Sequence, residues 1–285
     1  MEIMIDCIPC LLKQALEASK MATDDSNKQE EIVLEGLKIL LNYKNYRNSP
    51  DLARQIHLTI KEKTGIKDPY IQVKKRDLEF AKNLRPSLYK FLDSRDDKLY
   101  WALKVAAAGN NLDSAIYKET DIKKAIKEEL DKSFEISDID IFTEKLKSAK
   151  NILVIGDNTG ETVFDKIMIE YLPQINITYA VRSEPIINDV TEKEAYDSNL
   201  DEVSTIVSTG CNASGAILED CSEEFKILFK AADRIISKRQ GNYEALSEER
   251  GNVFFLLKAK CPMIASRLEV ELGSYVFKNN KFKNK

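Results

Sequence analysis

The fold of this 285-residue chain is decided by the stretch Ile152-Leu153-Val154-Ile155-Gly156-Asp157-Asn158-Thr159-Gly160-Glu161. Its first four residues form a wholly apolar run, which is typical of a strand buried on both faces of a parallel sheet. A polar turn follows, and apolar residues then recur at helical spacing from Val163 to Tyr171. This strand, turn and helix predict an α/β architecture.

The same unit repeats toward the C-terminus. Short apolar runs at 175–181, 203–207, 235–236 and 253–257 predict further strands, and Phe225, Leu228 and Phe229 mark a helix between two of them. Alternating strands and helices imply a largely parallel sheet with right-handed crossovers.

Toward the N-terminus the apolar spacing is helical, and no strand-like alternation competes with it. Leu52 and Ile56 share one face of an expected helix that Ser49 caps and Gly65 ends. Another helix is expected from about residue 98 to 108.

The change of pattern near residue 150 predicts two domains. A helical domain is expected over residues 1–148, and an α/β domain that binds metal and phosphate over residues 149–285.

The composition is that of a globular protein, with 43% hydrophobic and 32% charged residues. A net charge of −4 argues against a nucleic-acid partner, because such partners require clustered basic residues. No apolar stretch reaches the ~18 residues of a membrane span, and Glu2 and Asp6 stand where a secretory signal would be basic. Five cysteines without such a signal favour reduced thiols, so we expect a cytoplasmic protein. Monomer and homo-oligomer are both compatible with this composition.

Polar residues gather where the predicted strands end. In parallel α/β sheets, ligands bind outside the carboxyl ends of the strands. The segments 156–161, 182–189, 208–215 and 238–244 follow the first four strands and carry carboxylates, amides, hydroxyls, glycines and a lysine. A sheet that serves only as a scaffold does not need these groups at one edge.

The chemistry of these groups suits a cation and a phosphate together. Asp157, Asn158 and Asp189 offer only oxygen ligands, which magnesium and manganese prefer. Backbone amides at Thr209-Gly210 can face an anion, and Lys238 supplies a point charge for a phosphoryl oxygen.

Each of these residues also has a purely structural interpretation. Asp157, Asn158 and Asp189 are compatible with helix caps, Thr209-Gly210 with an ordinary turn, and Lys238 with a surface lysine. Their convergence on one sheet edge favours the functional interpretation.

Five short motifs occur in order along the chain. They are Cys7-Ile8-Pro9-Cys10, Gly109-Asn110-Asn111-Leu112-Asp113, Asp-Asn-Thr-Gly-Glu at 157–161, Pro-Ile-Ile-Asn-Asp-Val-Thr at 185–191 and Gln-Gly-Asn-Tyr-Glu at 240–244. Together they resemble the short archaeal and bacterial branch of the damage-control phosphatases, long known as domain of unknown function 89. The resemblance extends from residue 7 to about residue 270.

The resemblance implies a helical domain packed on a three-layer α/β/α domain. It also implies a phosphatase that needs a divalent cation (manganese, magnesium, cobalt or nickel) and hydrolyses phosphomonoesters of small metabolites, sugar phosphates included. The implied metal ligands are Asp157, Asn158 and Asp189. The implied catalytic and substrate residues are Asp157, Asp189, Glu161, Lys238, Ser208, Thr209, Gly210, Asn110 and Asp113.

The chain departs from the family pattern at Arg239, where a glycine is usual. A glycine there permits a positive φ or a close backbone approach. Arg239 either adds a phosphate contact or points outward.

Three roles stay open at this stage. The attacking group is a metal-activated water or a carboxylate, and the absence of an Asp-x-Asp pattern at 156–158 favours water. Cys7 and Cys10 have the spacing of half a zinc site, and serve in packing or near the active site. His57, the only histidine, is expected to border a packing face.

Two other functions compete with the phosphatase. An S-adenosylmethionine-dependent methyltransferase shares the strand, turn and helix, but its turn relies on glycines where this chain has Asp157, Asn158 and Thr159. A non-catalytic module for nucleotides or sugar phosphates would keep Thr209-Gly210 but would not need Asp157, Asn158 and Asp189 together.

Overall fold

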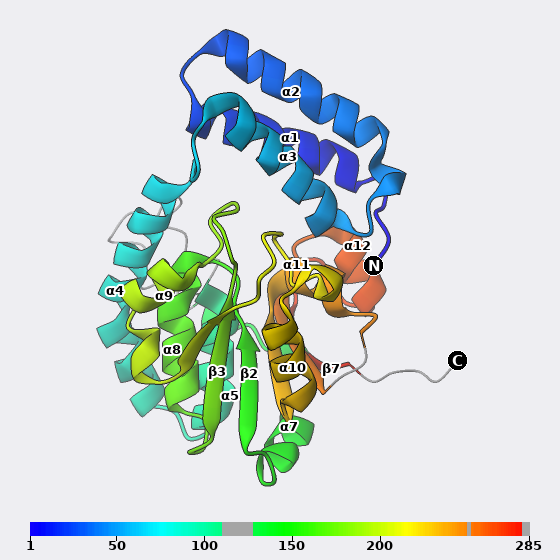
Figure 1. Ribbon diagram of the computed structural model, residues 1–285. Helices are drawn as coiled ribbons and strands as arrows, with labels where there is room; N and C mark the ends of the chain where they lie inside the picture. Colours follow the sequence, from blue (N-terminus) through cyan, green and yellow to red (C-terminus); the bar gives the residue numbers. More distant parts are fainter. Residues whose placement is uncertain (110–127, 250–251, 281–285) are drawn as a thin grey trace.

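The computed structural model describes residues 1–109, 128–249 and 252–280. A seven-stranded sheet lies at the centre of its α/β part (Figure 1). The strands are β1 (Phe134–Ser137), β2 (Asn151–Ile155), β3 (Asn176–Val181), β4 (Thr205–Ser208), β5 (Arg234–Lys238), β6 (Val253–Lys258) and β7 (Tyr275–Asn279). Their order is β1-β7-β6-β5-β2-β3-β4, and all neighbours are parallel except β6 and β7.

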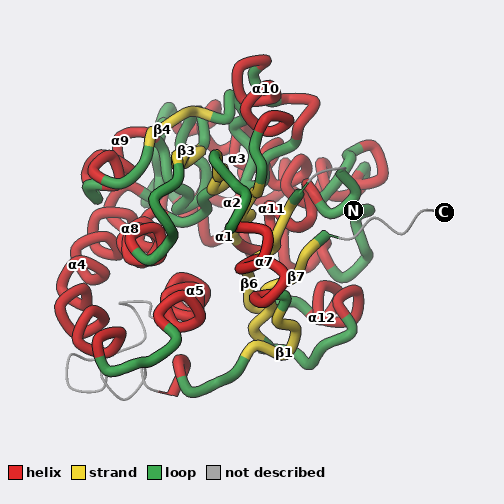
Figure 2. The backbone as a smooth tube through the Cα atoms, turned by 90° about the horizontal axis from the view of Figure 1, so that it is seen from below, coloured by secondary structure: helices red, strands yellow, loops and turns green. Residues whose placement is uncertain are grey.

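Helices cover both faces of the sheet. Figure 2 shows α4 (Ile71–Asp93), α5 (Lys98–Ala108), α8 (Thr162–Glu170) and α9 (Glu192–Asp197) on one side of the strands. The opposite side carries α10 (Glu223–Ala231), α11 (Arg239–Leu246) and α12 (Pro262–Leu268). The short helix α7 (Ile139–Leu146) joins the core of the first face.

The apolar run of β2 follows from this arrangement. Ile152 and Val154 point into the core beneath α4, α5 and α8, whereas Leu153 and Ile155 point into the core beneath α10 to α12. Successive side chains of a strand face opposite sides, so a strand covered on both faces needs an apolar residue at every position.

A three-helix bundle of α1 (Cys7–Ala22), α2 (Ser26–Leu41) and α3 (Ser49–Thr64) lies above the carboxyl ends of the parallel strands (Figure 1). It has its own apolar core, which includes Ile32, Leu52 and Ile60. Ile187, in the segment after β3, packs against this core.

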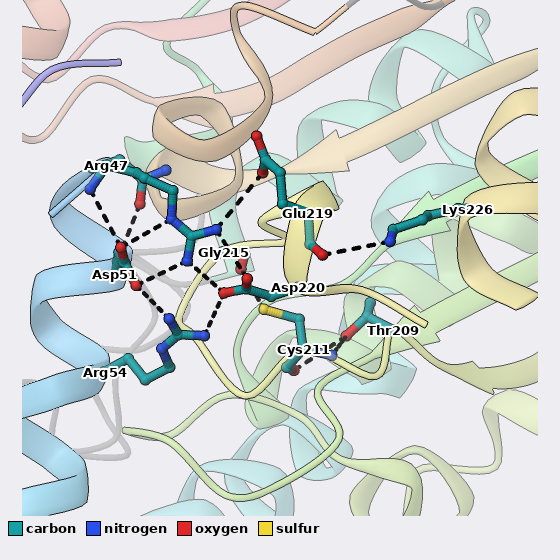
Figure 3. A network of polar contacts seen from close by, with 10 residues as sticks. Arg47, Asp51, Arg54, Thr209, Cys211, Gly215, Glu219, Asp220 and Lys226 are labelled. Atoms are coloured by element: carbon teal, nitrogen blue, oxygen red, sulfur yellow. Dashed lines mark hydrogen bonds and ion pairs between the residues drawn. The ribbon is translucent and has the colours of Figure 1, made fainter. Parts of the chain in front are cut away.

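An ion-pair network ties the bundle to the segment after β4 (Figure 3). Arg47 donates to the two Asp220 carboxylate oxygens at 2.9 and 2.6 Å, and Arg54 donates to Asp220 Oδ2 at 2.5 Å. Both arginines also bind Asp51 of α3. These arginines hold the pKa of Asp220 down to about 2. The bundle is thereby fixed over the edge where the strands end.

The predicted fold class, a largely parallel α/β/α sheet preceded by helices, is confirmed. All five predicted strands are present, and the helix 98–108 ends at Gly109 as expected. The cap of α3 differs, because the side chain of Asn48 accepts from the Asp51 amide at 3.1 Å and Ser49 is the first helical residue.

Two strands were missed. β1 has only four residues and occupies the edge of the sheet, and β7 runs antiparallel to β6 close to the lysine-rich end of the chain. The expectation that no strand precedes residue 150 is therefore wrong.

The division into domains at residue 148 stays a prediction. The α1–α3 bundle has its own core, whereas α4, α5, β1 and α7 also precede residue 149 and pack into the core of the sheet. Within the described ranges, no helix is long and apolar enough to span a membrane.

Candidate functional site

A cavity of about 190 Å³ opens at the carboxyl ends of β2, β3, β5 and β6. Carboxylates, amides and cationic side chains all line it. The lining residues are Asp157, Asn158, Ile187, Asn188, Asp189, Ser214, Arg239, Gln240, Gly241, Lys258 and Lys260.

Backbone hydrogen bonds bring the segments after β2 and β3 together at this cavity. The Val190 amide donates to Asp157 O at 2.7 Å, and the Thr159 amide donates to Asn188 O at 2.9 Å. Asn158 and Asp189 pair between these bonds as an isolated antiparallel bridge. The three predicted metal ligands therefore lie side by side, although they are about 30 residues apart in sequence.

The turn before these ligands requires a glycine. A Cβ on Gly156 would lie 2.5 Å from Tyr179 Oη of the neighbouring strand β3. The Tyr179 hydroxyl donates to Asp165 Oδ2 at 2.7 Å and is fully buried, so it cannot move aside easily.

Arg182 binds the carboxylates of both Asp157 and Asp189. It was not identified as a site residue from the sequence. Its Nε donates to Asp189 Oδ2 at 2.8 Å, and its Nη2 donates to Asp157 Oδ1 at 3.3 Å. Its Nη1 donates to Asn242 Oδ1 at 3.1 Å, and the guanidinium is fully buried. One guanidinium thus fixes the orientation of two acidic side chains.

The two carboxylates repel each other despite Arg182. Burial, and then the charges of Asp189 and Glu161, raise the pKa of Asp157 well above its ordinary value. Burial likewise raises the pKa of Asp189, with Arg182 opposing the shift. A further positive charge between these carboxylates would therefore be stabilising.

The donor set fits a hard divalent cation. Two carboxylates and one amide supply oxygens to a single cavity, as such cations prefer. Within the described ranges, no group of three or more His, Cys, Asp or Glu residues could hold a metal. Three protein oxygens fill only part of the coordination shell of such a cation, and water or substrate would complete it.

Lys238 lies beneath the cavity and does not line it. Its ammonium is fully buried, donates to Ala106 O at 3.0 Å and to Glu161 Oε2 at 3.2 Å, and also pairs with Asp165. The predicted phosphate contact of Lys238 is not among these contacts.

Glu161 is buried next to Lys238 and is outside the cavity lining as well. Its Oε2 accepts from Arg239 Nε at 2.8 Å, and the two cations lower the pKa of Glu161 against the effect of burial. In the described part of the chain, Glu161 Oε1 has no hydrogen-bond partner.

The loop Ser208-Thr209-Gly210 also lies outside the cavity lining. The Thr209 amide donates to Val181 O at 2.8 Å, and the Gly210 amide donates to Ser208 Oγ at 3.1 Å. Gly210 has a φ of 75°, and a Cβ there would lie 2.6 Å from the Ser222 amide nitrogen. These contacts describe a tight turn whose amides bind groups within the protein.

Three cations complete the cavity, and two of them were missed. Lys258 is the last residue of β6, and Lys260 lies two residues beyond it. In the sequence, site residues were sought after the first four predicted strands and not after this fifth one. Applying the strand-end rule to the run 253–257 would have found both lysines.

Arg239 is the third cation, and its side chain is buried instead of pointing outward. Its φ of 72° lies in the left-handed region, where a glycine is favourable.

The remaining predicted residues lie elsewhere. Asn110 and Asp113 fall outside the described residues. Cys7 is half-buried and Cys10 exposed at the start of α1, and their role stays a prediction. His57 is buried in α3 beside Tyr70, and burial lowers its pKa to about 4.

Comparisons with known proteins identify the family of the chain. Residues 3–276 match the family described as damage-control phosphatase ARMT1-like domain. A damage-control phosphatase of Pyrococcus horikoshii is 34% identical over 99% of this chain and 100% of its own length. A damage-control phosphatase of Archaeoglobus fulgidus is 31% identical over 95% of this chain and 97% of its own length.

A solved structure shares the fold. The crystal structure of a DUF89 family protein from Pyrococcus horikoshii superposes with a TM-score of 0.91 and 31% identity. The match covers 99% of this chain and all of that one.

Proposed function

This chain belongs to the damage-control phosphatase ARMT1-like family, and we propose that it hydrolyses phosphomonoesters of small metabolites with the help of a divalent cation. The observation that supports the metal and its place is the meeting of Asp157, Asn158 and Asp189 at one cavity that also carries cationic side chains. Oxygen donors and cations in one cavity suit a phosphorylated ligand.

In this proposal Asp157, Asn158 and Asp189 hold the cation, which is magnesium, manganese, cobalt or nickel. The chemistry that such a cation supplies when bound is Lewis-acid stabilisation of negative charge on phosphoryl oxygens. Arg182 keeps both carboxylates turned toward the cavity, since it binds one oxygen of each. Lys238 and Arg239 keep Glu161 in place through its Oε2.

The cationic side chains of the cavity favour an anionic substrate. Arg239, Lys258 and Lys260 line it from the ends of β5 and β6 and add fixed positive potential that attracts a phosphorylated substrate. The helical bundle lies above this edge of the sheet (Figure 1).

We favour water as the attacking group. Asp157 and Asp189 both bind Arg182, and an ion pair with a guanidinium weakens a carboxylate as a nucleophile. Acid-quenched samples taken during turnover would carry no covalent phosphoryl group on this account. Recovery of phosphoaspartate would assign the attack to a carboxylate instead.

We also propose a cytoplasmic location, because all five cysteines are free thiols. The proposed partner is a small phosphorylated metabolite.

A metal-dependent assay tests the function. Metal-stripped protein is assayed on p-nitrophenyl phosphate and several sugar phosphates, with and without each of the four metals. Asp157→Ala and Asp189→Ala should abolish metal-dependent release, whereas the exposed Asp201→Ala should not. Folded wild-type protein that releases no phosphate with any metal would refute the proposal and favour a non-catalytic binding module.

A further inference from the structure

Three cations line the cavity at the ends of β5 and β6. Arg239 follows β5, and Lys258 and Lys260 come from the end of β6, whereas Asp157 and Asn158 follow β2. The strand order β6-β5-β2-β3 therefore places the lysines two strand spacings, or about 10 Å along the sheet edge, from Asp157. A substrate whose phosphoryl group lies at Asp157 and Asp189 would extend along the sheet edge toward the two lysines.

Arg239 holds a conformation that its side chain disfavours. A φ of 72° is rare for residues with a Cβ, and such outliers cluster at functional sites. The side chain is buried and fixed by the 2.8 Å bond from its Nε to Glu161 Oε2. The chain thus has an arginine at a position with positive φ, where a glycine would adopt the backbone conformation with less strain.

The lysines are also held in place. Lys258 Nζ donates to Glu129 Oε2 at 2.8 Å, which fixes its ammonium beside the cavity. The Lys260 amide donates to Gln240 Oε1 at 2.6 Å, so the backbone after β6 is attached to the start of α11.

The three cations also repel one another. Desolvation, and then the charge of Arg239, lower the pKa of Lys260 to about 8; the charges of Glu161 and Asp157 oppose this shift, and that of Lys258 adds to it. A bound anion stabilises cations that repel one another. The repulsion therefore supports what the positions of the three side chains already suggest, namely that an anion binds among them.

We propose that Arg239, Lys258 and Lys260 form an anion subsite beside the phosphoryl position, and that the chain prefers small phosphomonoesters with a second acidic group. This inference rests on the proposed phosphatase function and adds the class of substrate to it. The second group is a carboxylate or another phosphate, because both present anionic oxygens to guanidinium and ammonium groups. A cavity of about 190 Å³ is smaller than drug-sized sites, and so suits a small metabolite.

Matched substrate pairs test the subsite. Glycerol 3-phosphate is compared with 3-phosphoglycerate, and fructose 6-phosphate with fructose 1,6-bisphosphate, at a fixed concentration of free Mn²⁺. The wild-type kcat/KM should be at least about tenfold higher for the doubly acidic member of one pair or both, the equivalent of about 1.4 kcal/mol. The pair that shows the preference tells a carboxylate from a second phosphate.

Variants assign the preference to the three cations. Arg239→Gly removes the charge and suits the positive φ, and Lys260→Met keeps the length of the side chain. Both should lower the ratio of kcat/KM within the preferred pair about tenfold. Lys193→Met, an exposed lysine outside the cavity lining, should leave that ratio unchanged.

The outcomes separate the two proposals. Phosphate release from all four substrates without preference, or a preference that survives in Arg239→Gly and Lys260→Met, would overturn the subsite and leave the phosphatase intact. No release from any substrate would contradict the phosphatase, and calorimetric Kd values for the same pairs would then decide the subsite. Equal Kd values for both members of each pair would overturn it.

Discussion

Replacing Arg182 by methionine should be among the most destabilising single changes in this chain. The guanidinium is fully buried and binds Asp189, Asp157 and Asn242. Methionine fills part of the space but leaves two buried carboxylates without their cation. Breaking a buried ion pair from one side destabilises proteins by roughly 3–5 kcal/mol.

This loss can be converted into a melting temperature. At roughly 2.1 cal/mol/K per residue, unfolding 285 residues in one transition has an entropy of about 0.6 kcal/mol/K. The expected drop in Tm is therefore about 5–8 °C. Urea unfolding and thermal melts of Arg182→Met in the presence of a chelator measure both quantities.

Arg267→Met is the matched control. Arg267 pairs with Glu248 at 3.0 Å, but both side chains are exposed, so the loss should stay below about 1 kcal/mol. Added Mn²⁺ should restore more stability to Arg182→Met than to the wild type, because it supplies the missing positive charge. If Arg182→Met loses no more stability than Arg267→Met, Arg182 does not compensate the two carboxylates as described.

Three further predictions concern stability. Burial raises the pKa of Glu244 to about 7, so the folded protein binds the extra proton and stability should fall by up to about 3 kcal/mol as pH rises from 4.5 to 7. Urea unfolding of Glu244→Gln across this pH range should not show that fall in stability. If the stability of the variant changes with pH as steeply as that of the wild type, Glu244 is not the group responsible. Burial lowers the pKa of His57 to about 4, so stability should fall in the opposite sense as pH drops from 6.5 to 4. In the same titration, His57→Gln should lose less stability than the wild type as pH drops. An equal loss in the two proteins would argue against His57 as the cause. Asp220→Asn should weaken the contacts with Arg47 and Arg54 by about 1–3 kcal/mol, and so speed hydrogen exchange in α3 relative to the sheet. Exchange in α3 that matches the wild type would show that other contacts hold the bundle.

Much of the fold follows from local patterns in the sequence. The apolar run 152–155 requires a strand with both faces covered, and the helix 98–108 is set by its own spacing and by Gly109. The strands β1 and β7 could not be found this way, because an edge strand of four residues and an antiparallel neighbour depend on pairing across the sheet.

The candidate site is predictable in part for the same reason. The strand-end rule places Asp157, Asn158 and Asp189 at one edge, and the structure brings them to one cavity. The rule cannot say which polar side chains turn inward. Lys238 turns beneath the sheet edge toward Ala106 of α5, a contact between segments 132 residues apart. The role of Arg182 likewise depends on the register between β2 and β3.

The most direct test of the central claim is a titration of metal-free protein with Mn²⁺, in which bound ion and phosphate release are measured in the same samples. We expect one ion per chain, release that rises in proportion to its binding, and loss of both in Asp157→Asn and Asp189→Asn. Phosphate release that proceeds without bound ion, or Mn²⁺ binding that survives in both variants, would contradict the claim that these residues hold the metal of a phosphatase.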